Sequence, residues 1–298
     1  MIAAVIVLYN PDMLLLDRLM RSVIGQVEKS FVIDNTPEST ANFSSFFDQY
    51  QANISYISLG ENKGIATAQN IGIRKSIEAG YSHVLLLDQD STLSDDMVKK
   101  LLEAEGELIH AGEKVAAVGP LFVEQKTGKP SHAIRHKLLW VKRIKINLSS
   151  NQQHESDYII SSGALIRTSV FTQIGAMLDE LFIDWVDIEW GLRAQRLGYK
   201  CFIIPRAVLK HSLGDTVVRI PGRDVNLHND TRHYYMVRNA TYLLRLKTMG
   251  LSWRIVTALK VPQYVVFYSW HSQRKTTSVR LLLGAFWDGI CGKLGRVD

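Results

Sequence analysis

The sequence predicts an α/β fold in which a parallel or mixed sheet is flanked by helices and is followed by a basic helical extension. Three observations support this prediction. Apolar strand-like segments alternate with helical segments along the first half of the chain. The 298 residues suffice for one large α/β domain with an appendage. Apolar residues make up 46% and charged residues 21% of the chain, which is typical of a globular core and argues against disorder.

The predicted strands of the first half are short apolar runs bounded by polar or turn-forming residues. They cover residues 3–9, 30–34, 54–59, 83–87 and 115–123. Helices are predicted over residues 11–27, 64–79 and 94–111, with Gly80 as a C-cap and Ser94 as an N-cap. The first run is apolar at every position, as expected of a strand that is buried on both faces of the sheet.

The second half is less regular. Residues 124–157 are polar and predict an irregular excursion or a hairpin. We then expect a strand at 158–166 broken by Ser161-Ser162-Gly163, a helix at 186–197, a strand at 200–204 and a loop at 209–227. The remainder is predicted to be mostly helical. This pattern divides the chain into a main α/β domain over residues 1–230 and a helical region over residues 231–298.

Two features bear on the compartment of the protein. Cys201 and Cys291 are too few for a disulfide framework or a cysteine zinc site, and they suit a reducing environment. The chain starts without a basic segment before its short apolar run, so we expect a buried strand and not a signal peptide. No stretch reaches about 18 apolar residues, so no transmembrane helix is predicted.

The net charge of +6 is concentrated at the C-terminal end. Residues 247–298 carry eight Lys and Arg residues and two Asp residues, whereas residues 1–246 are neutral overall. Two apolar stripes with helical spacing lie in the same segment, formed by Leu251, Ile255, Leu259, Val266 and Trp270 and by Val279, Leu282, Leu283, Phe286, Trp287 and Ile290. Basic amphipathic helices are typical of proteins on an anionic membrane, and a neutral main domain does not favour nucleic acid. The alternative is that both helices pack on the main domain or form a dimer.

Two carboxylates follow a buried strand at Asp88-Gln89-Asp90. In open α/β sheets, ligands bind outside the carboxyl ends of the strands, and paired carboxylates there can hold a divalent cation that binds a diphosphate. The alternative is a solvated turn with two surface acids. Asn10 and Asp34 end two other strands, and polar groups at three strand ends suggest a nucleotide site. The competing interpretation of Asp34 is a cap or an Asx-turn.

Residues 62–66 (NKGIA) precede a helix that carries Asn70 and Gly72. Gly64 permits a tight turn into this helix, and the amide groups at the helix start could face an anion. The alternative is ordinary turn chemistry, with close helix packing at Gly72.

Three acids, Asp184, Asp187 and Glu189, lie among large apolar residues in the segment 182–190 (FIDWVDIEW). Trp185 and Trp190 are suited to wall a dry pocket, which would raise the pKa of a carboxylate toward that of a useful base. Capping of a helix N-terminus by acidic side chains explains one or two of the three acids, but explains all three less well.

Basic residues further along suggest two more contributions. His211 could supply a third metal ligand beside Asp90, although a lone histidine is more often a packed or surface residue. Arg232 and Arg238 have aromatic residues between them and could clamp phosphates or pair with the acids of segment 182–190. The alternative for the two arginines is a solvated basic helix.

In this order, the motifs resemble those of the family 2 inverting glycosyltransferases with the GT-A fold, and within them bacterial rhamnosyltransferases that build surface polysaccharides such as O-antigen or capsule. The matching segments span roughly residues 1–245. They are VIVLYNP (5–11), IDN (33–35), ENKGIATAQNIG (61–72), LLLDQDS (85–91), SSGA (161–164), FIDWVDIEWGLR (182–193), HSLGD (211–215) and RHYYMVRN (232–239). The resemblance implies a Rossmann-like GT-A sheet followed by the C-terminal helices.

The resemblance also implies roles for individual residues. Asp187 takes the place of the catalytic base, but Val186 stands where many members carry Glu, so Asp184 and Glu189 remain alternatives. The metal, Mg²⁺ or Mn²⁺, would be held by Asp88, Asp90 and His211. The nucleotide sugar would lie on Tyr9, Asn10, Asp34, Gly64, Asn70, Asp88, Gln89, Arg232 and Arg238. The acceptor or sugar pocket would be formed by Gly163, Asp184, Trp185, Glu189 and Trp190.

The implied reaction is transfer of L-rhamnose from dTDP-β-L-rhamnose to a hydroxyl of a lipid-linked glycan, in one metal-dependent displacement that inverts the anomeric carbon. The enzyme would be cytoplasmic and peripheral, bound to the anionic inner face of the bacterial cytoplasmic membrane through residues 247–298. The sequence leaves open whether it forms a homo-oligomer.

Three alternatives to this function compete with it. One is a transferase of the same fold with a galactofuranose or N-acetylhexosamine donor. Another is a sugar nucleotidyltransferase, which Asn10-Pro11-Asp12 disfavours because that class carries a glycine-rich basic loop after its first strand. The third is a membrane-bound scaffold subunit without activity, which the intact Asp88, Asp90, Asp187 and His211 disfavour.

Overall fold

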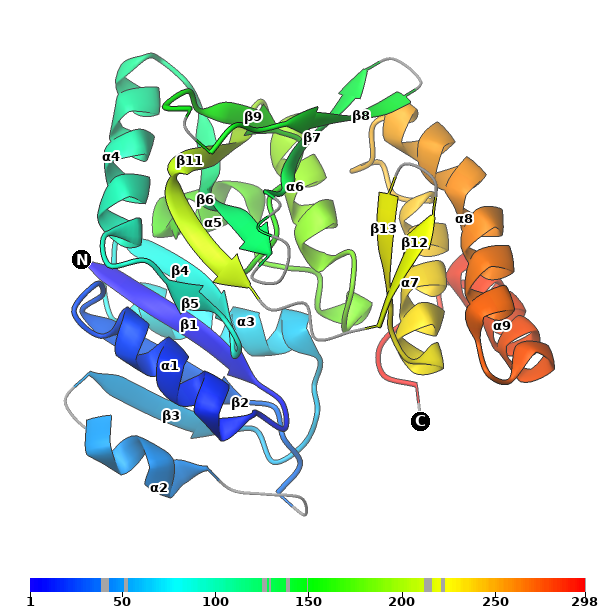
Figure 1. The fold of residues 1–298 in the computed structure, drawn as a ribbon, viewed down its shortest axis with the longest axis horizontal. Helices are drawn as coiled ribbons and strands as arrows, with labels where there is room; N and C mark the ends of the chain where they lie inside the picture. Colours follow the sequence, from blue (N-terminus) through cyan, green and yellow to red (C-terminus); the bar gives the residue numbers. More distant parts are fainter. Residues whose placement is uncertain are drawn as a thin grey trace.

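The computed structural model describes residues 1–38, 43–50, 53–124, 128, 130–137, 140–148, 150–211, 216–220 and 223–297. Within these residues, the centre is a nine-stranded sheet of order β3-β2-β1-β4-β10-β6-β11-β5, with β9 beside β11 (Figure 1). The strands are β1 (Ile2–Leu8), β2 (Lys29–Asp34), β3 (Ile54–Ser58), β4 (His83–Asp88), β5 (Thr92–Leu93), β6 (Val115–Glu124), β9 (His154–Ser156), β10 (Ala164–Arg167) and β11 (Lys200–His211). The predicted α/β fold with a C-terminal helical extension is confirmed.

The first four strands form the parallel half of the sheet. Leu8 of β1 pairs with Asp34 of β2, and Val7 pairs with Asp88 of β4. Parallel strands in this register end at the same edge, so the polar residues that follow β1, β2 and β4 lie together. The strand β10 runs antiparallel to both β4 and β6, which makes the sheet mixed.

Side chains of β1 alternate between two apolar cores, as the pleat of a strand requires. Val5 and Val7 lie in the core that includes α3 (Ile65–Glu78) and α6 (Val186–Arg196). Ile6 and Leu8 lie in the core that includes α1 (Met13–Val23) and α4 (Met97–His110). Helices therefore cover both faces of the sheet, and this explains why the strand is apolar throughout.

Gly72 shows how closely α3 approaches the sheet. A Cβ atom on this residue would lie 2.4 Å from Cγ1 of Val5, so a larger side chain would push the helix away from β1. The packing interpretation of Gly72 is therefore the one that the structure supports.

Smaller elements complete the fold. They are α2 (Ser44–Phe47), η1 (Asp48–Tyr50), α5 (Thr168–Ile174), η2 (Asp179–Leu181), and the hairpins β7 (His132–Lys137) with β8 (Trp140–Lys145) and β12 (Thr216–Ile220) with β13 (Arg223–Leu227). The polar segment 124–157 thus contains a hairpin, which is one of the two structures predicted for it. The helix α5 was not predicted, because its seven residues are too few to show a period.

Two predictions about local structure were wrong. The loop expected at 209–227 contains the end of β11 and the hairpin β12–β13, because β11 continues to pair with β6 and β5. Ser94 does not cap α4, since its hydroxyl donates to the carbonyl of Val208 and the helix starts at Met97. The Ser94 side chain therefore binds a carbonyl that is distant in sequence, and not the start of the helix as the local sequence predicts.

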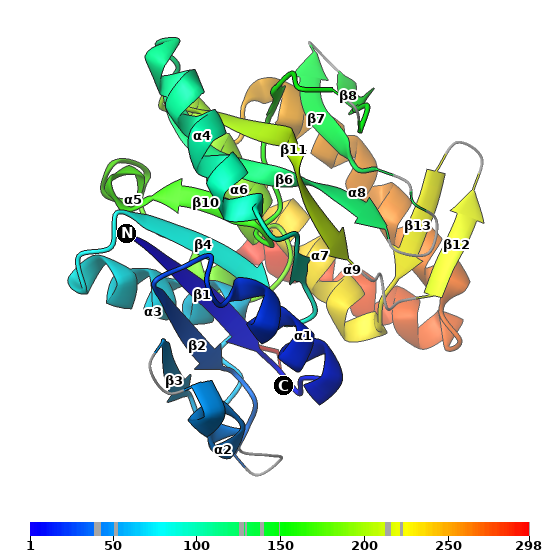
Figure 2. The ribbon, with the colours of Figure 1, turned by 60° about the vertical axis from the view of Figure 1, so that its left-hand side comes forward.

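Three helices form the C-terminal region, α7 (Asp230–Leu243), α8 (Leu251–His271) and α9 (Lys275–Cys291). They pack on one another beside the sheet (Figure 2). Buried residues of α7 and α9, such as Val237 and Leu282, belong to the same core as Val5. One face of α8 and α9 stays open, where Leu259, Trp270 and Trp287 are more than 60% exposed. Among the described helices, none has both the length and the hydropathy to span a bilayer.

Candidate active site

A cleft of about 690 Å³ opens at the edge where β1, β2 and β4 end. Its lining comes from those strand ends, the start of α3, the segment that precedes β10, the loop before α6 and the start of α7. The lining residues are Val7, Tyr9, Asn35, Asn62, Gly64, Ile65, Asp88, Gln89, Asp90, Tyr158, Ile160, Ser161, Phe182, Ile183, Asp184, Trp185, Val186, Asp187, Ile188, His228 and Arg232. The predicted strand-end motif and residues 182–188 therefore line the same cleft.

The strand-end wall carries Tyr9, Asp88, Gln89 and Asp90. Gln89 fastens the ends of β1 and β4 together, because its side-chain oxygen accepts from the Tyr9 N–H at 2.7 Å and its amide donates to the Tyr9 carbonyl at 3.1 Å. Tyr9 is 47% exposed, and its aromatic side chain is suited to contact a planar ligand. Asp88 and Asp90 supply carboxylate oxygens, which is the donor chemistry that Mg²⁺ and Mn²⁺ accept.

Asp34 and Asn10 lie beside the cleft without lining it. Asp34 is buried, and its two oxygens accept from the Tyr56 hydroxyl at 2.5 Å and from the Thr36 N–H at 2.9 Å. The N–H of Asn10 donates to the hydroxyl of Thr36 at 2.9 Å. The Asx-type contact from Thr36 matches the structural interpretation of Asp34.

Asn35 lines the cleft in their place. Its side-chain amide donates to Asn62, and its oxygen accepts from the Lys63 N–H at 2.8 Å. The pair thereby holds the loop that leads into Gly64. The sequence motifs assigned no role to Asn35, although it follows Asp34 directly in the segment IDN (33–35).

The loop from Phe182 to Trp185 has an unusual backbone. Phe182, Asp184 and Trp185 all have positive φ angles, of 64°, 61° and 67°. Side chains other than glycine adopt this region at a cost of about 1 kcal/mol or more each. Such a loop persists only where its surroundings fix it.

Asn239 of α7 supplies the main fixing contacts. Its fully buried side-chain amide donates to the carbonyls of Leu181, Ile183 and Asp184, at 2.9, 2.8 and 3.0 Å. Three carbonyls around one amide hold the loop in place shortly before α6 begins. Asn239 is a residue whose role the sequence did not reveal, because the contacts join segments that are 55 to 58 residues apart.

The start of α3 supports the same loop from the other side. The N–H groups of Ile65 and Ala66 both point at the carbonyl of Phe182, at 2.7 and 3.4 Å. A Cβ on Gly64 would lie 2.5 Å from the Phe182 ring, so only glycine fits there. The prediction that these amides face an anion was therefore wrong, since a protein carbonyl occupies them.

Arg238 is fully buried and does not line the cleft. Its guanidinium donates to the carbonyls of Leu181 and Gly295, at 3.1 and 2.5 Å, and lies over the Tyr235 ring. It therefore joins the loop before α6 to the C-terminal segment. Because its guanidinium is buried and binds these carbonyls, Arg238 does not reach a phosphate in the cleft.

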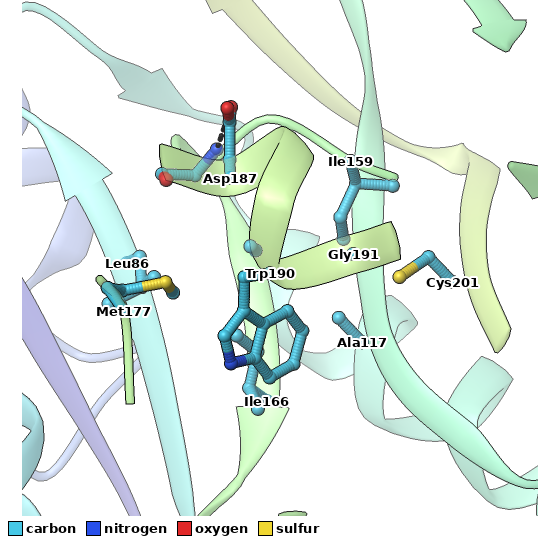
Figure 3. A pocket seen from close by; sticks show the side chains of 11 residues that line it. Leu86, Ala117, Ile159, Ile166, Met177, Asp187, Trp190, Gly191 and Cys201 are labelled. Carbon is cyan, nitrogen blue, oxygen red and sulfur yellow. Dashed lines mark hydrogen bonds between the residues drawn. The ribbon is translucent and has the colours of Figure 1, made fainter. Parts of the chain in front are cut away.

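Asp187 sits in the first turn of α6, where the cleft meets a small apolar cavity of about 10 Å³. Figure 3 shows its carboxylate at one end of the apolar side chains of Met177 and Trp190. The carboxylate accepts from the N–H groups of Ile188 and Ser161, at 2.8 and 3.3 Å. Burial of the carboxylate raises the pKa of Asp187 from 3.8 to about 6. The nearby negative charges of Asp88 and Asp184 contribute in the same direction.

Asp184 and Arg232 face each other in the cleft. The Arg232 guanidinium donates to both carboxylate oxygens of Asp184, at 3.1 to 3.3 Å. The charge of Asp184 is therefore paired with a cation, and both of its oxygens already accept hydrogen bonds. Arg232 remains 40% exposed at the rim, where it faces the ligand space.

Four further predicted site residues lie outside the cleft. Glu189 is fully buried and forms a two-pronged ion pair with Arg193, at 3.0 and 2.9 Å. The indole N–H of Trp190 donates to the Gly175 carbonyl. Asn70 binds the backbone of Met177 through both ends of its amide. Gly163 packs against Pro120, where a Cβ would lie 2.6 Å from the ring.

His211 ends β11, but its side chain belongs to the part of the chain that the structure does not describe, as do residues 212–215. Within the described residues, no group of three or more His, Cys, Asp or Glu side chains is placed to hold a metal. The fit to a divalent cation therefore depends on Asp88 and Asp90, with further oxygen ligands left to a bound diphosphate and water.

The sequence over residues 3–175 matches the family described as Glycosyl transferase family 2. The chain belongs to glycosyl transferase family 2. This glycosyltransferase is 37% identical over 247 residues to a dTDP-rhamnosyl transferase, RfbF, from Shigella flexneri, and the match covers 82% of this chain and 80% of that relative. It is 25% identical over 180 residues to the low-salt glycan biosynthesis hexosyltransferase Agl10 of Haloferax volcanii, which covers 59% of this chain and 56% of that relative.

Solved structures show the same fold in glycosyltransferases with very different sequences. GalNAc-T7 with UDP, GalNAc and Mn²⁺ has a TM-score of 0.59 at 15% identity, over 90% of this chain and 54% of the other. This chain thus spans about half the length of GalNAc-T7. TarS 1–349 of S. aureus with UDP-GlcNAc has a TM-score of 0.56 at 13% identity, over 97% of this chain and 81% of the other. At such low identities, these structural similarities establish the common fold alone.

Proposed function

We propose that this glycosyltransferase moves L-rhamnose from dTDP-β-L-rhamnose to a hydroxyl of a lipid-linked glycan, in the synthesis of bacterial surface polysaccharide. The observation that supports the transfer chemistry best is Asp187, a half-buried carboxylate with a pKa raised to about 6 in the same cleft as Asp88 and Asp90. The donor is supported by the 37% identity to a dTDP-rhamnosyl transferase.

In the proposed reaction, Asp187 removes the proton of the acceptor hydroxyl. The hydroxyl oxygen forms a bond to the anomeric carbon while the bond from that carbon to the diphosphate breaks, and the electron pair leaves on the diphosphate. A single displacement of this kind inverts the anomeric carbon. A carboxylate with a pKa near 6 is largely ionised at pH 7 and is still basic enough to take the proton.

Asp88 and Asp90 are the residues that would hold Mg²⁺ or Mn²⁺, with His211 as a further candidate. When bound there, the cation would neutralise negative charge on the departing diphosphate. The protein itself contributes Arg232 at the rim of the cleft, a cation able to pair with phosphate oxygens once it exchanges part of its contact with Asp184. Tyr9 offers its exposed ring to the base or sugar of the nucleotide.

The C-terminal region is proposed to bring the enzyme to an anionic membrane surface. Leu259, Val266 and Trp270 of α8 and Leu283 and Trp287 of α9 are each more than half exposed. Exposed cations such as Arg254, Arg274 and Arg280 lie on the same two helices or beside them. Apolar insertion and attraction to anionic headgroups would then add together. The opposite faces of these helices pack into the core, so packing and membrane contact are not exclusive.

A transfer assay across nucleotide sugars tests this proposal. We expect release of dTDP from dTDP-β-L-rhamnose to exceed release of UDP from UDP-galactofuranose and UDP-N-acetylglucosamine by at least tenfold, and to cease when EDTA removes divalent cations. A preference for a UDP-sugar would contradict the proposed donor. Equal rates in EDTA would contradict the proposed metal dependence.

A further inference from the structure

The hairpin β7–β8 lies in the most one-sidedly charged stretch outside the C-terminal region. Residues 125–153 contain seven Lys and Arg residues and no Asp or Glu. The rest of residues 1–246 balances this excess, so it does not show in the net charge. A local concentration of one sign of charge marks a surface that meets the opposite sign.

Along β8, Val141 and Ile144 pack against the core, whereas Lys142, Arg143 and Lys145 are exposed. Trp140 stands at the start of the strand with 78% of its surface exposed, next to Leu138 and Leu139 in the sequence. A strand end that carries an exposed tryptophan between flanking lysines is suited to the boundary between water and lipid, where indole rings and basic side chains gather.

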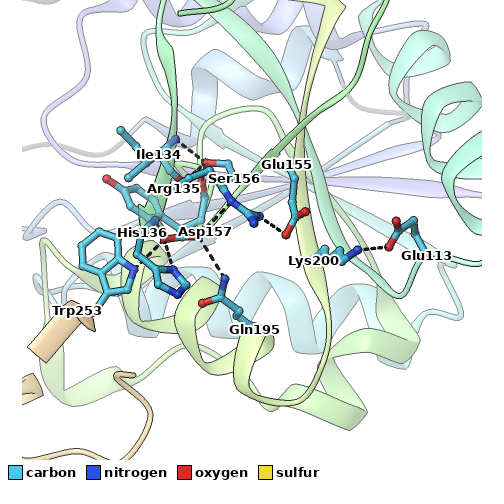
Figure 4. A network of polar contacts seen from close by, with 11 residues as sticks. Glu113, Ile134, Arg135, His136, Glu155, Ser156, Asp157, Gln195, Lys200 and Trp253 are labelled. Carbon is cyan, nitrogen blue, oxygen red and sulfur yellow. Dashed lines mark hydrogen bonds and ion pairs between the residues drawn. The ribbon is translucent and has the colours of Figure 1, made fainter. Parts of the chain in front are cut away.

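A buried carboxylate ties this hairpin to α8 (Figure 4). Asp157 accepts from the N–H and the ring Nδ1 of His136 on β7, at 2.6 and 2.8 Å. The same carboxylate accepts from the indole N–H of Trp253 on α8 at 2.8 Å and from Gln195 on α6 at 3.2 Å. Hairpin and helix are therefore joined through hydrogen bonds to one buried group.

The hairpin thus extends the exposed surface of α8. Both β7 and β8 contact α8, and Figures 1 and 2 both show the hairpin beside that helix. Arg254, near the start of α8, is exposed and adds a cation to those of the hairpin. Asp157 also directly precedes Tyr158, which lines the cleft, so the group that holds the hairpin is adjacent in sequence to the wall of the active site.

We infer that the hairpin β7–β8 is a second contact with an anionic bilayer, in which Lys137, Lys142 and Lys145 meet the headgroups and Trp140 enters the interface. This inference rests on the membrane setting of the proposed function. It adds a contact remote in sequence from residues 247–298, and two contacts joined through Asp157 would fix the orientation of the cleft over the membrane. A lipid surface fits better than nucleic acid, because the aromatic tip calls for an apolar phase.

Binding of the full-length protein to vesicles tests the inference. The variants are Lys142→Gln/Lys145→Gln and Trp140→Ala, and the matched control is Lys75→Gln/Lys99→Gln, which removes two exposed lysines from α3 and α4. With vesicles of phosphatidylcholine and phosphatidylglycerol, we expect the hairpin lysine variant to bind about 10- to 30-fold more weakly than the control, since each lysine near the surface contributes roughly a factor of five. Trp140→Ala should weaken binding about tenfold.

The outcomes separate this inference from the proposed function. If Arg254→Gln/Arg274→Gln/Arg280→Gln lowers vesicle binding while the hairpin variants match the control, the hairpin contact is wrong and the C-terminal contact stands. If the hairpin variants bind vesicles normally but lose activity on a short soluble acceptor, the hairpin binds the glycan and the inference is overturned. Loss of vesicle binding with unchanged dTDP release supports it.

Discussion

The two walls of the cleft are built in different ways. The wall at the ends of β1 and β4 is local: Tyr9, Asp88 and Asp90 follow directly after buried strands, and Gln89 joins the strand ends with two hydrogen bonds. The wall before α6 depends on distant segments, because Asn239, Arg238 and the start of α3 all bind a loop with three positive φ angles. The residues proposed to bind the donor therefore lie on strand ends, whereas the loop before the proposed base is held by long-range contacts.

The largest expected effect is at the base. Asp187→Asn keeps the size of the side chain but cannot accept a proton near neutral pH, so kcat should fall by roughly 10²–10⁴ with little change in donor affinity. Steady-state kinetics and calorimetry with dTDP measure the two quantities. Asp184→Asn is the control, and we expect it to lose less, because Asp184 is paired with Arg232. A dead Asp184→Asn beside an active Asp187→Asn would move the base to Asp184.

The next effect concerns the opposite wall. Asp90→Ala should lower the metal-dependent affinity for dTDP by about tenfold or more, because it removes one of the two carboxylates proposed to hold the metal. The affinity in EDTA should not change. Asp95→Ala removes an exposed carboxylate shortly after the strand-end motif and is the matched control. Titration calorimetry with and without Mn²⁺ checks the result, and an unchanged metal-dependent affinity would contradict the metal assignment.

Removal of the long-range support should harm stability and turnover together. Asn239→Ala removes the side-chain donor from the carbonyls of Ile183 and Asp184 and one of several donors to the carbonyl of Leu181, which should cost about 2–4 kcal/mol in the free energy of unfolding. The kcat of the folded protein should fall about 10-fold or more, since the loop before Asp187 relaxes. Urea denaturation and kinetics measure both. Glu189→Gln serves for comparison: it weakens a buried ion pair with Arg193 outside the cleft, so it should lower stability with a much smaller change in kcat.

The smallest expected effect links the base to stability. The pKa of Asp187 is raised from 3.8 to about 6 in the folded protein, so ionisation of this group disfavours folding. The contribution of Asp187 to the stability of the wild type therefore decreases as the pH rises from about 4 to 6. Asp187→Asn should be more stable than the wild type by about 1–3 kcal/mol above pH 6, and the difference should vanish near pH 4. Denaturation across this pH range checks the sign, and a destabilised variant at pH 7 would contradict it.

The contrast between the walls also explains how far the sequence could predict the molecule. Apolar runs separated by helical segments predict the parallel strands correctly. Asp88, Asp90 and Asp187 all line the cleft, as expected. Arg238, Asn70 and Glu189 were assigned to ligands, but their charges and amides satisfy buried backbone groups or a neighbouring ion pair. Sequence patterns identify residue types that bind polar groups, but they do not show whether a distant carbonyl or a substrate is the partner. Asn239 was missed for the same reason.

The central claim is that Asp187 acts as the base, and the pH dependence of kcat tests it most directly. The base must be ionised to accept a proton, so the wild-type kcat should rise through an apparent pKa of about 6 and level off above it. The residual kcat of Asp187→Asn should show no such rise. An acid limb near pH 6 that persists unchanged in Asp187→Asn, or a wild-type kcat that stays level down to pH 5, would contradict the account.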